Sequence, residues 1–277
     1  MSKNKVKNVA RKVYNKHATD YRTSKYKRVI DNFGNRCISK LLLPNIKLES
    51  ESKVLELACG EGHFTRDLLA EFPEGEFLAT DYSDEMVDYV RSTLGDKGNV
   101  KSERLNALEL DNKYPKSDFT FVVFRNSEVY FAAKEKQLLF MKIYKVLKPG
   151  GFFFYQPVDF ASDQIQTIKS PKSIVEKIHV HYMANYFLSV LKARHASRES
   201  MLQEITKIGF TLSGEENKEY AHQINNYGEL KGEMGMGIEA RLEISGYNVL
   251  LFKFLARFIA KYPIVHNLNQ SGFLFQK

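Results

Sequence analysis

An acid and two glycines follow one another along an apolar run, in a spacing that suits nucleotide binding. The segment from Val54 to Thr65 reads V-L-E-L-A-C-G-E-G-H-F-T, with Glu56 inside the run and a Gly-x-Gly turn at Gly60 and Gly62. Glycine accepts positive φ and has no β-carbon, so the backbone of such a turn can approach a ligand at the N-terminus of the following helix. The pattern indicates a nucleotide-binding turn.

A second acid follows the next apolar run and bears on the kind of nucleotide. The run Glu76–Thr80 is followed by Asp81, about 20 residues past the glycines, where a carboxylate can accept hydrogen bonds from both hydroxyls of a ribose. Thr65 stands where a dinucleotide-binding loop has its third glycine. Glu56 would repel a diphosphate but suits an ammonium or sulfonium group, and S-adenosylmethionine (AdoMet) carries both. These residues favour AdoMet over a dinucleotide.

Four separated segments are similar to class I AdoMet-dependent methyltransferases that act on small molecules. They occur in the expected order over roughly residues 53–157. The resemblance implies a Rossmann-like fold, AdoMet as the cofactor, and in-line methyl transfer to an oxygen, nitrogen or carbon atom of the acceptor. The segments are L-E-L-A-C-G-E-G-H-F-T-R (Leu55–Arg66), A-T-D-Y-S-D-E-M-V (Ala79–Val87), S-D-F-T-F-V-V-F-R-N-S-E-V-Y (Ser117–Tyr130) and V-L-K-P-G-G-F-F-F (Val146–Phe154).

The resemblance also implies which residues bind the cofactor. Asp81 holds the ribose and Tyr82 flanks the adenine, with Met86 in the following helix as a further candidate. In this family an acid after the third strand usually meets the adenine amino group, but the matching stretch here has Asn106 and Ala107. Asn106 can still accept a hydrogen bond through its amide oxygen. The methionine end is expected to contact residues of the turn and the backbone after the fourth strand, namely Glu56, Ala58, Gly60, Gly62, Arg125 and Asn126.

Methyl transfer from a sulfonium requires alignment of the reactants more than it requires a base. His181 and Tyr130 are the expected catalytic residues if a base is used, since a histidine can take a proton near neutral pH. His63, His179 and Asp159 are further candidates. Each of these side chains could instead have a structural role.

The N-terminal region is basic and has the periodicity of two helices. Residues 1–53 hold 14 Lys or Arg against 4 Asp or Glu, and the whole chain has a net charge of +8. Apolar residues recur every three or four positions in 6–13 and 26–42, which predicts helices. The basic arm could bind RNA, anionic lipid or an acidic substrate, or it could be the solvated face of these helices. Between the helices, Tyr14 and Tyr21 resemble a segment that folds over the cofactor in many small-molecule methyltransferases, although both could equally pack on the core.

Apolar strands alternate with amphipathic helices through the middle of the chain. The expected class is α/β, with a Rossmann-like doubly wound sheet of about seven strands. We expect an N-terminal helical lid (1–48), an AdoMet-binding core (49–160), and a remainder (161–277) with a helical cap insertion around 215–271. Lys148–Gly151 is predicted to be a turn. The predicted strands are 53–58, 76–80, 100–105, 118–124, 151–156, 210–214 and 272–277, and the predicted helices after the N-terminal region are 63–72, 84–94, 134–147, 172–192 and 198–208.

Composition sets the wider expectations. A chain of 277 residues with 43% hydrophobic content can form one large domain. Cys37 and Cys59 provide neither a disulfide framework nor metal-ligand spacing, so no metal is expected. No apolar run is long enough to span a bilayer, so we expect a soluble cytoplasmic protein. The amphipathic stretch 247–262 could pack on its own domain, cover an apolar pocket or contact a membrane surface.

The methyl acceptor is expected to be a small, apolar or aromatic metabolite, and nucleic acid is not an expected partner. Two other functions remain open at this point. One is an RNA-directed methyltransferase, which the basic arm would suit. The other is a non-catalytic AdoMet-binding regulatory protein, whose cofactor site would have the same sequence pattern. The sequence indicates no oligomeric state.

Overall fold

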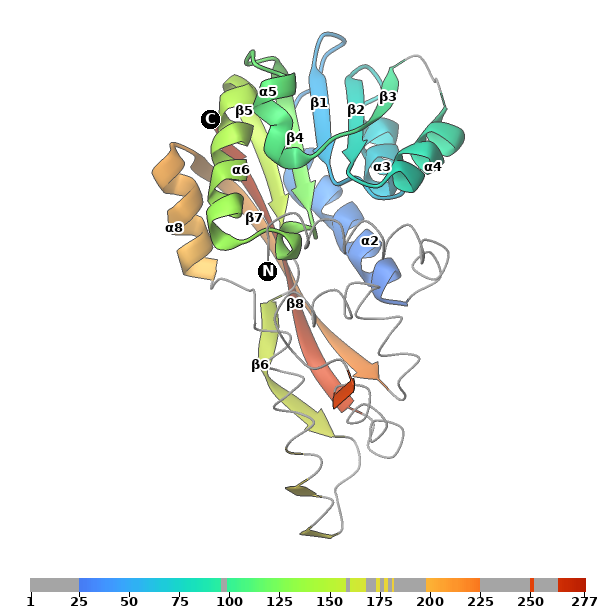
Figure 1. Cartoon of the computed structure of the whole chain (residues 1–277), viewed down its shortest axis with the longest axis vertical. Coiled ribbons are helices and arrows are strands. Elements are labelled where there is room, and N and C mark those ends of the chain that lie inside the picture. Colours follow the sequence, from blue (N-terminus) through green and yellow to red (C-terminus); the bar gives the residue numbers. More distant parts are fainter. Residues whose placement is uncertain are drawn as a thin grey trace. The chain divides into compact units, whose positions relative to one another are not determined.

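The computed structural model describes five long stretches of the chain and a few residues between them (Figure 1). The stretches are residues 25–95, 99–157, 160–167, 198–224 and 264–277, and the further residues are 173–174, 177–178, 181 and 250–251. The chain divides into two compact units. The core unit consists of residues 30–158, 196–217 and 271–277, and the second unit consists of residues 1–29, 159–195 and 218–270. Tyr14, Tyr21 and the predicted helix at 6–13 lie outside the described residues.

The core unit is built on a parallel sheet with the strand order β3-β2-β1-β4-β5. Glu56 in the central strand lies opposite Ala79 of β2 and Val123 of β4. The strand order reverses between β1 and β4, and in such sheets a ligand binds at the carboxyl ends of the strands at this point. The strands are β1 (Lys53–Leu57), β2 (Glu76–Asp81), β3 (Val100–Arg104), β4 (Phe119–Arg125) and β5 (Leu147–Gln156).

Strand β8 (Ile264–Gln276) extends the sheet beyond β5. Its C-terminal part pairs antiparallel with β5, with Phe275 opposite Phe153. Strand β7 (Thr211–Ile224) also pairs with β8. In the second unit, the N-terminal part of β8 pairs antiparallel with β6 (Phe160–Thr167). The mixed sheet confirms the predicted Rossmann-like α/β class.

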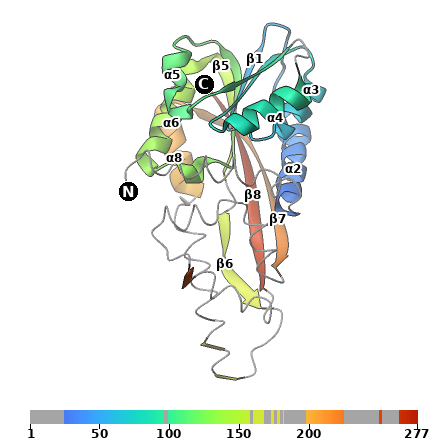
Figure 2. The same cartoon turned by 45° about the vertical axis from the view of Figure 1, so that its right-hand side comes forward.

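Helices cover both faces of the sheet. Figure 2 shows α3 and α4 on one side of the strands and α5 and α6 on the other. Helix α4 begins after Ser83, whose hydroxyl accepts a hydrogen bond from the Met86 amide at 3.4 Å. The helices are α2 (Lys25–Cys37, continued by a π-helical turn at Ile38–Leu42), α3 (His63–Glu71), α4 (Asp84–Leu94), α5 (Leu110–Lys113), α6 (Ala133–Val146) and α8 (Arg198–Ile208), with 3₁₀ turns at Ala107–Glu109 and Glu128–Tyr130.

Phenylalanine side chains fill the space between the sheet and both layers of helices. Neighbouring residues of a strand point to opposite faces. Accordingly, Phe153 packs against Phe140 of α6, with ring centroids 6.0 Å apart, while Phe154 stacks on Phe64 of α3 at 5.6 Å. Aromatic rings bury large areas and so stabilise such a core strongly. Much of the phenylalanine content is therefore explained by packing of the sheet.

The C-terminal strands are longer than predicted. The strand expected at 210–214 is Thr211–Ile224, and the strand expected at 272–277 begins at Ile264. Strand β6 has no counterpart among the predicted strands. The first ten residues of β7 read T-L-S-G-E-E-N-K-E-Y, and these polar residues hide the apolar alternation that identifies a strand. Residues 215–224 and 264–271 of the predicted cap insertion therefore belong to strands β7 and β8. The segment between these strands, 225–263, lies outside the described residues except for residues 250–251, which are helical.

The turn predicted at Lys148–Gly151 is instead part of strand β5. Gly150 has a φ of 76°, as the sequence suggested, but its amide donates to the Lys277 carbonyl at 3.1 Å. The Lys277 amide in turn donates to the Gly151 carbonyl at 2.9 Å. The end of the chain therefore holds this segment in the sheet, and a local reading of Pro and Gly residues could not show that distant partner.

Within the described part of the chain, no helix combines the length and apolar character that a membrane span requires.

Candidate cofactor-binding site

The turn after β1 contains three residues with left-handed backbone conformations. Ala58, Gly60 and Gly62 have φ values of 55°, 55° and 69°. At Gly62 a β-carbon would lie 2.9 Å from Cγ2 of Val90, so both the conformation and the space require glycine. At Gly60 a β-carbon would meet nothing within 4 Å, so the backbone there borders open space. Helix α3 begins at His63, and its N-terminus is thereby presented at the turn.

Asp81 joins the end of β2 to this turn. One oxygen of its carboxylate, Oδ2, accepts a hydrogen bond from the Gly60 amide at 3.0 Å, and Oδ1 accepts one from the Ser83 amide at 2.8 Å. Burial raises the pKa of Asp81, while these backbone hydrogen bonds lower it. A carboxylate has about four acceptor sites, so these two bonds leave acceptor capacity for hydroxyl donors. The structure thus brings together the acid and the glycine turn that the sequence singled out.

Glu56 is buried beneath the turn, with 4% of its surface exposed. Its Oε2 accepts a hydrogen bond from the hydroxyl of Thr65 in the first turn of α3. Burial raises the pKa of Glu56 to about 7, although the Thr65 bond and the charge of Arg125 lower it. Thr65 therefore donates a hydrogen bond to the buried acid from the position where a dinucleotide-binding loop has glycine.

Two residues at the end of β4 complete this edge of the sheet. Asn126 has a φ of 51°, and its amide donates to the Gln156 carbonyl at 2.7 Å. Its buried Oδ1 has no hydrogen-bond partner among the described residues, as expected of an acceptor reserved for a ligand. Arg125 was expected to contribute its backbone, but its side chain turns into the core, where it is 9% exposed. These features fit AdoMet. The buried acid Glu56 and the Oδ1 acceptor of Asn126 suit its ammonium and sulfonium groups, and Asp81 beside the turn suits its ribose.

Residues 54–151 match a family model described as a methyltransferase domain, and this range contains the turn, Asp81 and the parallel strands β1 to β4. The chain carries a class I AdoMet-dependent methyltransferase domain. The strand order, with antiparallel β8 beside β5, agrees with this assignment.

Several relatives share parts of this methyltransferase sequence or fold. An uncharacterised methyltransferase of Schizosaccharomyces pombe is 25% identical over 119 residues, which cover 42% of this chain and only 43% of that protein. A malonyl-[acyl-carrier protein] O-methyltransferase of Bacillus cytotoxicus is 24% identical over 233 residues, covering 76% of this chain and 78% of the relative. The YcgJ protein of Bacillus subtilis has a similar fold, with a TM-score of 0.55 at 17% identity and coverage of 89% and 98% of the two chains.

Two of the residues predicted to contact the adenine, Asn106 and Tyr82, have partners within the protein. Asn106 accepts a hydrogen bond from the Leu108 amide at 3.2 Å and donates to Glu109 at 3.1 Å, so it caps the 3₁₀ turn that contains Ala107. Tyr82 is partly exposed, and the Arg104 guanidinium lies 5.2 Å from its ring centroid. Met86 is only 2% exposed. Of these residues, Tyr82 therefore has the ring surface most suited to an adenine.

The two predicted catalytic residues belong to different units of the chain. Tyr130 is partly exposed in the 3₁₀ turn after β4, in the core unit, whereas His181 is exposed in the second unit. His63, in the first turn of α3, lies 3.1 Å from the buried carboxylate of Glu61. Sequence reasoning missed the side chain of Arg125 and the fully buried Gln156. The available signal was a polar residue directly after the runs F-V-V-F in β4 and F-F-F-Y in β5.

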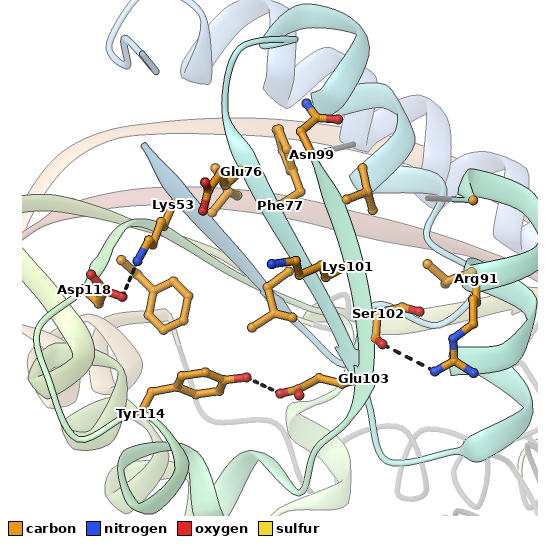
Figure 3. Close-up of a pocket in the computed structure, with 16 residues that line it drawn as sticks. Lys53, Glu76, Phe77, Arg91, Asn99, Lys101, Ser102, Glu103, Tyr114 and Asp118 are labelled. Atoms are coloured by element: carbon orange, nitrogen blue, oxygen red, sulfur yellow. Dashed lines mark hydrogen bonds and ion pairs between the residues drawn. The ribbon is translucent and has the colours of Figure 1, made fainter. Parts of the chain in front are cut away.

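A separate cavity of about 480 Å³ lies away from this site (Figure 3). It is lined largely by residues that begin the strands, among them Lys53, Glu76 and Asp118, and by Tyr114. Lys53 pairs with Asp118 at 2.7 Å, and Tyr114 donates a hydrogen bond to Glu103 (Figure 3). Because ligands of parallel α/β sheets bind at the carboxyl ends of the strands, we do not assign the cofactor to this cavity.

Proposed function

We propose that this chain transfers the methyl group of AdoMet to a small-molecule acceptor by in-line attack of an oxygen, nitrogen or carbon atom. The observation that carries the proposal is the Asp81 carboxylate, held by the Gly60 and Ser83 amides beside a left-handed turn. This arrangement offers acceptors to ribose hydroxyls and exposed backbone to the rest of the ligand. The match of residues 54–151 to the methyltransferase domain supports it independently.

The roles of individual residues follow from charge and position. Asp81 would hold the ribose, and the backbone at Ala58, Gly60 and Gly62 would contact the methionine end. The carboxyl of Glu56 would attract the positive groups from beneath the turn, and Oδ1 of Asn126 would accept from the ammonium. Tyr82 would flank the adenine, with Asn106, Ala107 and Met86 nearby.

AdoMet supplies a methyl group on a positively charged sulfur, which is itself a good leaving group. The chain has only to bind, orient and exclude water. Alignment of two reactants can contribute about 7–11 kcal/mol to lowering a barrier. Tyr130 and His181 are proposed as groups that could accept a proton from the acceptor. Tyr14 and Tyr21 are proposed to close the site.

The acceptor is proposed to be an apolar or aromatic small molecule. Relatives of this chain are named for other acceptors: malonyl-[acyl-carrier protein] and trans-aconitate. A screen for the acceptor should therefore include carboxylic acids beside apolar and aromatic metabolites. Transfer of label from methyl-labelled AdoMet to one class would identify it.

The screen should compare the wild type with Asp81→Ala and Asp118→Ala. Asp118 is an acid paired with Lys53 at the opposite ends of the strands, so its loss should leave transfer unchanged. Asp81→Ala should reduce transfer at least tenfold at limiting AdoMet. Label transfer to RNA alone would favour the RNA-directed alternative. AdoMet binding without transfer to any acceptor class would favour a regulatory protein and contradict the proposed activity.

A further inference from the structure

The side chain of Arg125 connects four elements of the core unit. Its Nε donates to Oε1 of Gln156 at 2.7 Å, at the end of the neighbouring strand β5. Its Nη2 donates to the Ile30 carbonyl of helix α2 at 3.4 Å. The guanidinium carbon lies 3.9 Å from the centroid of the Phe64 ring in the first turn of α3. One cation thus contacts α2, α3 and β5 from the end of β4.

Helix α2 is shaped to admit this guanidinium. Gly34 lies in the middle of the helix, where glycine is less favourable than alanine because it gives the unfolded chain more freedom. A β-carbon at Gly34 would lie 2.7 Å from Nη2 of Arg125 and 3.2 Å from the Phe64 ring. The absence of a side chain at Gly34 therefore makes room for Arg125. The Phe64 face and the Gln156 amide oxygen then supply a cation–π contact and a hydrogen-bond acceptor.

A buried cation also needs a negative partner, and Glu56 is the buried acid of the adjacent strand. Glu56 pairs in register with Val123, two residues before Arg125. Burial raises the pKa of Glu56, whereas the Thr65 hydrogen bond and the positive charge of Arg125 lower it. The charges of Asp81 in β2 and Asp67 in α3 raise the pKa of Glu56 further. The charge of Glu56 in turn raises the pKa of the Cys59 thiol. The positive charge of Arg125 thus opposes the effect of Asp81 and Asp67 on the pKa of Glu56.

We propose that Arg125 is a positioning residue of the cofactor site, which holds helix α2 on the sheet and supplies the counter-charge for the carboxyl of Glu56 behind the turn. The effect on AdoMet rests on the proposed function. The effect on Glu56 does not, because it concerns the protein without ligand.

The direct test is the titration of Glu56 in the unliganded protein. Carboxyl-carbon NMR of glutamate-labelled protein would follow it, with Glu56→Gln identifying the signal. Arg125→Met removes the charge at similar length, and Arg125→Lys keeps the charge but loses the forked geometry. We expect Arg125→Met to raise the Glu56 midpoint by about 1–3 pH units and Arg125→Lys to leave it near the wild-type value. An unchanged midpoint in folded Arg125→Met protein would overturn the proposal.

A double-mutant cycle keeps the proposal testable if Arg125→Met is poorly folded. Urea midpoints would be compared for the wild type, Arg125→Met, Glu56→Gln and the double variant at pH 8. Removal of one charge of a coupled pair leaves the other uncompensated, so Arg125→Met should cost less stability in the Glu56→Gln background. Additive losses would contradict the coupling.

AdoMet binding supplies the readout that a purely structural role would not change. In the wild type, affinity should increase as the pH rises through about 7, where Glu56 becomes charged. Arg125→Met should move this rise to higher pH, whereas a loose fold would weaken binding equally at every pH. Failure of the wild type to bind AdoMet at any pH would remove the proposed function, and the Glu56 midpoint would still decide the role of Arg125.

Discussion

At the scale of residues, the candidate site depends on backbone conformations that only part of the sequence reveals. Gly60 and Gly62 were predicted to adopt positive φ because glycine does so at little cost, and the structure confirms this. Ala58 and Asn126 adopt similar φ values of 55° and 51°. Alanine rarely does so, and no local pattern predicts it. Such conformations persist where the surrounding structure imposes them, commonly at functional sites.

Gly95 provides a control for a test of the turn at Gly60. Both have positive φ, 55° and 60°, and a β-carbon on either would meet nothing within 4 Å. Alanine at either position should cost stability, about 1–3 kcal/mol by urea unfolding, with the larger loss at Gly95, whose ψ of 178° lies in a region that essentially only glycine adopts. Only Gly60→Ala should weaken AdoMet binding, by about tenfold or more, because only Gly60 lies in the candidate site. Equal binding by the two variants would show that the turn does not approach the ligand.

Glu56 should make the stability of the chain decrease as the pH rises. Its pKa is about 7 in the folded chain, against an ordinary value of 4.5. The folded state holds this proton more tightly, so stability is lost between those two values and the loss is complete above pH 7. The difference corresponds to about 3 kcal/mol. Urea unfolding from pH 4 to 8 should show a smaller decrease for Glu56→Gln than for the wild type. The exposed Glu76 provides a control, since Glu76→Gln should retain the wild-type slope.

At the scale of elements, local patterns predicted the helices and parallel strands of the methyltransferase domain well. Helix α4 was predicted at 84–94 and spans Asp84–Leu94, because Ser83 is a good N-cap and apolar residues follow at helical spacing. All five parallel strands were found within four residues of their predicted bounds. Strands β1 and β4 are short apolar runs, whereas β3 reads V-K-S-E-R. Strands β6 and β7 are polar along much of their length, and their pairing with distant β8 leaves no local signal.

The capping of α4 can be tested by removing one hydroxyl. Ser83 accepts from the Met86 amide, and Ser83→Ala should reduce the free energy of unfolding by about 1 kcal/mol. Ser92 on the same helix is exposed and donates only to the Tyr89 carbonyl at 2.8 Å. Ser92→Ala should therefore leave the unfolding free energy within about 0.5 kcal/mol of the wild type. A loss for Ser92→Ala as large as that for Ser83→Ala would contradict the assigned cap.

At the scale of the whole molecule, the site assembles from the carboxyl ends of strands far apart in sequence. Gly60, Asp81 and Asn126 share one edge of the sheet because they lie at the carboxyl ends of β1, β2 and β4, which are adjacent parallel strands. The sequence did not indicate that Arg125 would reach back to helix α2, since that contact joins residues 95 positions apart. The acceptor is not encoded in these shared elements, because class I folds serve many substrates and specificity depends on what covers the site.

The most direct test of the central claim is calorimetric titration of AdoMet into the wild type, Asp81→Ala and Asp118→Ala. The three proteins should first be shown to unfold cooperatively. If AdoMet binds at the carboxyl ends of β1 and β2, the wild type and Asp118→Ala should bind with similar affinity, and Asp81→Ala should bind at least tenfold more weakly. Failure of the folded wild type to bind AdoMet, or equal binding by Asp81→Ala, would contradict the assignment.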